Sequence, residues 1–303
     1  MISARGLRKS YGEFEAVRGI DLEVAKGEIF AFLGPNGAGK TTTVEVLEGY
    51  RERSAGEVSV LGADPAAASR AWRARIGIVL QELRLTPELT VREAVALYAG
   101  YYPSPRDVDE TVGLVGLEEK SGERTSRLSG GQQRRLDVAL ALVGDPELLF
   151  LDEPTTGFDP AARRRAWEMI GNLGRLGKTV FLTTHYMDEA QALADRVAIL
   201  ARGEIVAEGP PDKLSGEGPS DAVIKFRLPD GVEAADLPAR VTGPAQIDGR
   251  AVSVTTEDPL PLLDELTSWA VERGAGLAGL EVRRPSLEDT YLRLVAEAEG
   301  VER

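Results

Sequence analysis

The chain of 303 residues has no cysteine and a single histidine, His185. The missing cysteine excludes disulfides, thiolate metal sites and cysteine nucleophiles, and one histidine excludes a multi-histidine metal site. No apolar run approaches the roughly 18 residues that a transmembrane helix needs. Arginines interrupt the N-terminal segment, which therefore does not resemble a signal peptide. These absences predict a soluble protein that suits a reducing cytoplasm.

Basic side chains are scarce relative to acidic ones. There are 36 lysines and arginines against 49 aspartates and glutamates, a net charge of −13. Such a chain repels phosphate backbones, so we expect no nucleic-acid partner. The excess is uneven, because residues 216–303 hold 17 acidic and 9 basic side chains. This segment is a poor surface for nucleic acid or anionic lipid.

The length predicts about two domains, and a Gly/Ser/Pro-rich stretch at 215–220 is the expected linker. Residues 1–215 begin strand-rich and then alternate strands with helices, with a helix-rich insert between about 82 and 145. This alternation predicts an α/β domain built on a parallel sheet covered on both faces. Residues 216–303 predict a small α+β domain, with strands at 222–228, 251–256 and 277–282 and helices at 261–273 and 286–296.

A glycine-rich loop lies between a predicted strand and a predicted helix. Its sequence is Gly34-Pro35-Asn36-Gly37-Ala38-Gly39-Lys40-Thr41 and fits G-x-x-x-x-G-K-[ST]. In that context the backbone N–H groups and the helix N-terminus cradle phosphates. We expect Lys40 to reach the β- and γ-phosphates and Thr41 to bind Mg²⁺, with Thr42 in the same nucleotide site. The alternative is a glycine-rich turn before a helix.

Two carboxylates, Asp152 and Glu153, follow the apolar run 148–151. Ligands of parallel sheets bind at the carboxyl ends of strands. We expect Asp152 to hold Mg²⁺, directly or through water, and Glu153 to act as the general base on the attacking water. The alternative is an acidic strand end that caps the next helix.

A third motif opens the helix predicted at 130–143. It reads Leu128-Ser129-Gly130-Gly131-Gln132, and its serine precedes Asp152 by 23 residues. Two glycines leave the first N–H groups of the helix exposed and Ser129 adds a hydroxyl, which predicts a second anion-binding helix end. Taken alone, the motif also fits an ordinary capped helix.

As a set, the three motifs resemble the ATP-binding subunits of ATP-binding cassette (ABC) transporters over residues 1–215. The resemblance implies a P-loop NTPase fold with a RecA-like parallel core, an antiparallel β subdomain and a helical insert. It implies ATP hydrolysis with ATP and Mg²⁺ as cofactors.

The resemblance also assigns roles to single residues. It places Tyr11 on adenine, Gln81 on Mg²⁺ and the attacking water, Asp159 in a dimer-contact loop, and His185 on the γ-phosphate. Three of them have a plain alternative: Tyr11 as a surface aromatic, Gln81 as a polar strand end, and His185 as a helix neighbour without a role. Phe158 departs from the leucine usual in the family.

Residues 129–139 and 285–292 resemble daunorubicin-resistance-type exporter subunits. This implies a peripheral ATPase at the cytoplasmic face of the membrane that powers export of drugs, antibiotics or other amphiphiles through a separate integral-membrane permease. It also implies a homodimer, in which the phosphate loop of one chain and the signature Ser129-Gly130-Gly131-Gln132 of the other enclose each of two ATP molecules. We expect residues 216–303 to regulate or stabilise that dimer.

Other functions remain open at this point. One is a non-transport ABC ATPase of the translation or DNA-repair type, although the chain has one cassette and no visible coiled coil. Another is an importer ATPase, which only the C-terminal end disfavours. A P-loop kinase or GTPase also fits the phosphate loop, but would have no use for the Ser129-Gly130-Gly131-Gln132 segment.

Overall fold

A computed structural model describes residues 1–79, 87–215, 222–229, 231–243, 245–283 and 286–299. Gln81 and most of the expected linker lie outside these residues. The chain divides into two compact units, one of Met1–Pro211 with Leu294–Arg303 and one of Asp212–Arg293.

A six-stranded sheet forms the centre of the first unit, in the order β5-β6-β7-β3-β8-β9. Its strands are β3 (Ile29–Leu33), β5 (Ile76–Val79), β6 (Leu148–Asp152), β7 (Thr179–Thr184), β8 (Arg196–Ala201) and β9 (Glu204–Gly209). β3 and β7 are buried at every position, as expected of a parallel sheet with both faces covered.

The predicted parallel sheet needs one correction. β9 runs antiparallel to β8, because only two residues connect the two strands. Arg202 and Gly203 both have positive φ, 49° and 84°, which is the conformation of a tight hairpin turn. A parallel neighbour would have required a long crossover.

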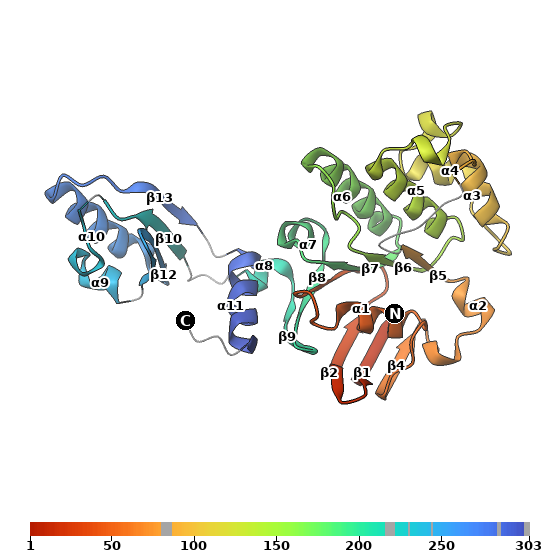
Figure 1. The fold of residues 1–303 in the computed structure, drawn as a ribbon, viewed down its shortest axis with the longest axis horizontal. Helices are drawn as coiled ribbons and strands as arrows, with labels where there is room; N and C mark the ends of the chain where they lie inside the picture. The colour runs from red at the N-terminus through yellow and green to blue at the C-terminus, as the bar shows by residue number, and fades with distance from the viewer. Residues whose placement is uncertain (80–86, 216–221, 230, 244, 284–285, 300–303) are drawn as a thin grey trace. The chain divides into compact units, whose positions relative to one another are not determined.

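A three-stranded antiparallel sheet in the order β2-β1-β4 packs over the phosphate-loop helix. Its strands are β1 (Ile2–Tyr11), β2 (Phe14–Val24) and β4 (Ala55–Val60), and the helix is α1 (Lys40–Leu47). One buried cluster joins this sheet, α1 and the six-stranded sheet, including Leu7, Val44 and Phe181. The helix that carries the phosphate loop is therefore fixed between two sheets (Figure 1).

Helices cover the other face of the six-stranded sheet (Figure 1). The predicted insert is present as α3 (Val91–Ala99), α4 (Val108–Leu114) and α5 (Gly130–Leu142), followed by α6 (Pro160–Arg175) and α7 (Met187–Leu193). The short helices are α2 (Arg70–Arg73) and α8 (Pro211–Leu214).

The second unit is a four-stranded antiparallel sheet with a helix on one face. The strands, in the order β11-β12-β10-β13, are β10 (Ala222–Arg227), β11 (Ala245–Asp248), β12 (Ala251–Thr256) and β13 (Ala278–Arg283). Phe226, Val254 and Leu266 belong to its core. The helices are the short α9 (Ala239–Thr242), α10 (Pro259–Glu272) and the first part of α11 (Leu287–Glu299), whose residues from Leu294 onward belong to the first unit. Apart from the direction of β9, the predicted fold class is confirmed. Over the described residues, no helix is both long and apolar enough to cross a membrane.

Candidate functional site

Strand register brings the predicted site segments together. β6, β7 and β3 are parallel neighbours, with Asp152 opposite Thr183 and Leu33 opposite Thr184. The loops that follow these strands therefore leave the sheet at one edge. They carry the phosphate loop, Glu153 and His185.

Steric contacts fix the shape of the phosphate loop. Gly39 caps α1 with a φ of 104°, and a Cβ there would lie 2.4 Å from the carbonyl oxygen of Ala16. A Cβ on Gly34 would lie 2.5 Å from the carbonyl oxygen of Leu200. Only glycine fits at either position, so packing within the chain itself requires these two glycines.

The ammonium group of Lys40 is held inside the loop. The residue is 7% exposed, and Nζ donates to the carbonyl oxygens of Gly34 at 2.7 Å and Pro35 at 3.1 Å. Burial lowers the pKa of Lys40, which the carboxylates of Glu153 and Asp152 oppose. A buried cation with carbonyl partners is well suited to exchange them for an anionic ligand.

The ends of β6 and β7 are joined by Thr183. Its hydroxyl donates to Oδ1 of Asp152 and accepts the backbone N–H of Glu153 at 3.1 Å. Glu153 has a φ of 45°, a left-handed conformation that costs a non-glycine residue roughly 1 kcal/mol or more. Sequence reasoning did not single out Thr183, since nothing but its neighbour in the sheet reveals its role.

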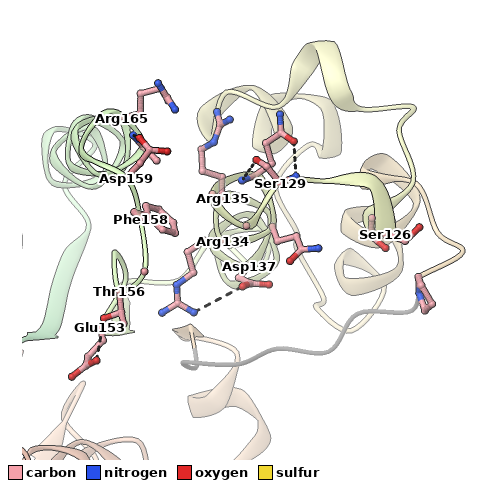
Figure 2. Close-up of a pocket in the computed structure, with 18 residues that line it drawn as sticks. Ser126, Ser129, Arg134, Arg135, Asp137, Glu153, Thr156, Phe158, Asp159 and Arg165 are labelled. Carbon is pink, nitrogen blue, oxygen red and sulfur yellow. Dashed lines mark hydrogen bonds and ion pairs between the residues drawn. The ribbon is translucent and has the colours of Figure 1, made fainter.

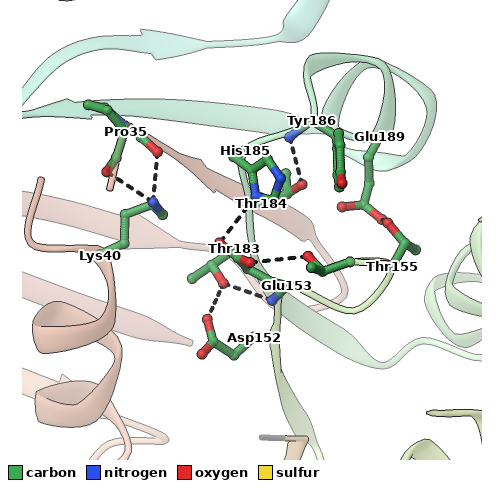
Figure 3. Close-up of polar contacts among 12 residues, drawn as sticks. Pro35, Lys40, Asp152, Glu153, Thr155, Thr183, Thr184, His185, Tyr186 and Glu189 are labelled. Atoms are coloured by element: carbon green, nitrogen blue, oxygen red, sulfur yellow. Dashed lines mark hydrogen bonds and ion pairs between the residues drawn. The ribbon is translucent and has the colours of Figure 1, made fainter. Parts of the chain in front are cut away.

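Glu153 and His185 meet at this edge. Oε1 of Glu153 lies 3.2 Å from Nδ1 of His185 (Figure 3). Oε2 of Glu153 accepts from the hydroxyl of Thr156 at 3.1 Å. Two residues that are 32 positions apart thus form one polar pair next to Lys40. A carboxylate in this place can accept a proton from water, and the imidazole can contact a phosphate oxygen.

Arg134 links α5 to the end of β6. Its side chain is buried and donates to the carbonyl oxygens of Asp152 at 2.5 Å and Pro154 at 3.3 Å. Burial lowers the pKa of Arg134, and Asp137, 3.9 Å away, opposes that effect. Sequence reasoning missed this contact, although a charged pair spaced i, i+3 just before the apolar run 138–143 was a signal for it.

The signature segment lines a cavity of about 1110 Å³ (Figure 2). Ser129 caps α5: its backbone N–H donates to Oε1 of Gln132 at 2.9 Å, and Oγ accepts from the N–H of Gln132 at 3.4 Å. A Cβ on Gly130 would meet nothing within 4 Å, and one on Gly131 only Cβ of Ala162 at 3.6 Å. The cavity also reaches Glu153 and Asp159.

The remaining predicted residues lie in different settings. Asp159 caps α6 by accepting the N–H of Ala162 at 2.8 Å. Tyr11 ends β1, is 42% exposed, and has Lys9 Nζ and Arg51 Cζ each 5.3 Å from its ring centre. Gln81 falls outside the described residues.

The donor set fits Mg²⁺ and a nucleotide. Thr41 and Asp152 supply a hydroxyl and a carboxylate, and within the described ranges no three His, Asp or Glu side chains form a protein-only metal site. Mg²⁺ in phosphate-transfer sites is held by one or two protein oxygens with phosphates and water. The glycine cradle around Lys40 accommodates those phosphates.

Family models match both parts of the chain. Residues 17–156 match the model described as ABC transporter, and residues 222–286 match the ABC transporter domain-containing protein-like C-terminal domain. The Nod factor export ATP-binding protein I of Rhizobium sp. (strain N33) is 41% identical over 97% of this chain and 96% of its own length. That of Paraburkholderia xenovorans is 39% identical over 95% and 94%.

The chain belongs to the ATP-binding subunits of ABC transporters. Solved cassettes agree: the dimeric MJ0796 cassette in a post-hydrolysis state bound to ADP and Pi has a TM-score of 0.62 at 27% identity, covering 69% of this chain and 98% of that one. An ATP-binding subunit of an ABC transporter has a TM-score of 0.64 at 26% identity, over 72% and 92%. The predicted family, the ATPase activity and the exporter-type assignment are confirmed.

Proposed function

We propose that two copies of this ABC ATPase enclose two ATP molecules, each between the phosphate loop of one copy and the signature of the other. The observation that carries this is the cavity at Gly130 and Gly131. Its described lining reaches Glu153 but includes no residue of the phosphate loop 34–41. A nucleotide whose phosphates reach this exposed helix N-terminus is therefore held by the phosphate loop of another chain. A two-fold pairing of identical chains supplies one to each signature.

Residues of one copy prepare the hydrolytic step. Lys40 exchanges its loop carbonyls for phosphate oxygens, while Thr41 and Asp152 hold Mg²⁺, which neutralises developing charge on the phosphates when bound. Glu153 orients the attacking water and accepts its proton. His185, 3.2 Å from Glu153, contacts the γ-phosphate. We assign Asp159 to the contact between copies, Tyr11 to adenine, and Gln81 to Mg²⁺ and the water.

We propose that this ATPase drives export of an amphiphile through a separate membrane permease. The named relatives export Nod factor, which supports the direction. The helical insert offers exposed apolar groups for a permease, with Leu97 49% and Tyr101 64% exposed. We assign residues 1–215 to the cassette, and 216–303 to an accessory domain that regulates or stabilises the dimer.

Co-purification from native membranes tests this function. Tagged Glu153→Gln, which we expect to bind ATP without turning it over, is extracted in mild detergent with Mg²⁺ and ATP, and wild type without nucleotide is the control. A stoichiometric multi-span protein supports the transporter assignment. Recovery of ribosomes, nucleic acid or no membrane protein would contradict it.

A further inference from the structure

A fully buried carboxyl group lies behind the site and has no part in the chemistry described above. Glu189 on α7 is 0% exposed. Its Oε1 accepts from the hydroxyl of Thr155 at 2.8 Å and from Nε1 of Trp167 at 3.1 Å. Oε2 has no hydrogen-bond partner among the described residues. Burying an acid without a paired cation lowers the stability of the fold. A role for Glu189 near the site would explain why the fold keeps it there.

Glu189 contacts the loop that carries Glu153 and lies on the helix that follows His185 (Figure 3). Thr155 lies two residues after Glu153. On the other side, Glu189 belongs to α7, which begins at Met187, two residues after His185. Thr184 immediately precedes His185, and its hydroxyl accepts the N–H of Tyr186 at 3.0 Å. Glu189 therefore joins the loop after β6 to the helix that follows the loop after β7.

The chemistry of the contact favours an uncharged acid. Burial raises the pKa of Glu189, although the hydroxyls of Thr184 and Thr155 and the indole of Trp167 partly oppose this. A neutral carboxyl has nearly the shape of a carboxamide, and both accept hydrogen bonds through Oε1. Glutamine can therefore preserve the support that alanine removes.

We propose that Glu189 is a positioning residue of the ATPase site, which holds Glu153 and His185 at their 3.2 Å separation by joining the two loops. The proposal rests on the roles assigned to Glu153 and His185 above. Removing the carboxyl lets the loops move independently, which misplaces the groups that act on water and the γ-phosphate. The phosphate loop makes no described contact with Glu189, so ATP binding is spared.

The test compares Glu189→Ala, Glu189→Gln and Glu28→Gln in the full chain. Glu28 is a matched control, because it is also buried and ion-paired to Arg196 at 2.9 Å but precedes β3, at the opposite end of that strand from the phosphate loop. The measurements are kcat, KM, the Kd of a fluorescent ATP analogue, thermal stability, and the indole N–H resonance of Trp167 by NMR.

We expect Glu189→Ala to lower kcat by about 30-fold with Kd within about threefold of wild type. Glu189→Gln restores kcat to within about threefold, and the Trp167 resonance shifts strongly only in the alanine variant. Glu28→Gln loses stability but keeps kcat. The proposal is overturned if Glu189→Ala has the kcat of the control, or if its kcat falls only in step with ATP binding.

The proposed function is tested separately by Glu153→Gln in the same assays. If Glu153→Gln hydrolyses ATP like wild type, the assignment of the general base fails, whatever Glu189 does. If Glu153→Gln is inactive and Glu189→Ala is not, only the positioning role fails.

Discussion

Two helices of the cassette have glycines at their N-termini, and we assign both ends to anion binding, yet the glycines differ in their surroundings. In the phosphate loop before α1, Gly39 has a positive φ and no room for a Cβ, with the Ala16 carbonyl oxygen 2.4 Å from it. In the signature, Gly130 and Gly131 are the first residues of α5 and have room for one. The first loop is demanded by the fold of its own chain, and the second is not.

This difference supports the proposal that the signature acts on a nucleotide held by the phosphate loop of another chain. The phosphate loop is closed around its own lysine, which its carbonyls already hold at 2.7 and 3.1 Å. The signature keeps its glycines without an internal steric reason and opens into a cavity. Without side chains at these glycines, a nucleotide can approach the backbone closely, as in the proposed dimer.

The largest expected effect comes from the charge inside the first loop. Lys40→Met removes the only described cation that the loop carbonyls hold, so we expect ATP affinity and ATPase rate each to fall about 100-fold or more. Isothermal titration and phosphate release measure the two losses. Normal ATP binding by Lys40→Met would contradict the role that we assign to the phosphate loop.

Replacing a glycine by alanine at each helix start should change the stability of the protein by different amounts. Gly39→Ala combines a strained φ with backbone overlap, so we expect it to lose about 3 kcal/mol or more of unfolding free energy. Gly131→Ala finds ordinary contact with Ala162, and we expect unfolding free energy within about 1 kcal/mol of wild type. Urea denaturation of both variants measures this.

Activity should separate the same variants in another way. We expect Gly131→Ala to bind ATP with a Kd within about threefold of wild type while its ATPase rate falls about 30-fold. Full activity at normal stability would show that the bare backbone at the signature has no ligand.

The smallest expected effect concerns one acid on each of these two helices, the half-buried Glu48 and the buried Asp137. Burial, with the carboxylates of Asp152 and Glu45, raises the pKa of Glu48 to about 8 at the end of α1. Burial raises the pKa of Asp137 on α5 to about 6, against the opposing effect of Arg134. The acid on α1 thus faces other acids, whereas the acid on α5 faces an arginine.

Glu48 should therefore make the nucleotide-free protein less stable as pH rises. The ordinary pKa of a glutamate is 4.5, so between that pH and about 8 the folded state keeps a proton that the unfolded state has lost, and the unfolding free energy declines. We expect Glu48→Gln to stabilise the protein by about 1–3 kcal/mol at pH 8 and by little at pH 4.5. Asp137→Asn is the comparison. Because the pKa of Asp137 is about 6, its effect on the unfolding free energy should change mostly below about pH 6. A gain from Glu48→Gln that does not depend on pH would contradict this.

Local patterns were enough to predict most of the fold. The apolar runs before Gly34 and Asp152 and the cap at Ser129 are signals carried by neighbouring residues, and the structure has strands or helices at each of them. The shared edge followed from the rule that ligands bind at the carboxyl ends of parallel strands.

Contacts between distant segments could not be predicted in this way. Thr183 bridges Asp152 and Glu153 because of strand register, and Arg134 reaches the end of β6 because α5 packs there. β9 runs antiparallel to β8 because only two residues connect the two strands. The length of that turn is known only once the ends of both strands are known. Such features depend on the packed structure, and a single sequence gives them only a weak signal.

The most direct test of the central claim is the oligomeric state of Glu153→Gln with Mg²⁺ and ATP, measured by size-exclusion chromatography with light scattering. The account predicts a dimer that retains two ATP molecules, and a nucleotide-bound monomer when Gly131→Ala is added to the same chain. A Glu153→Gln protein that stays monomeric with ATP bound, or a dimer that persists despite Gly131→Ala, would contradict it.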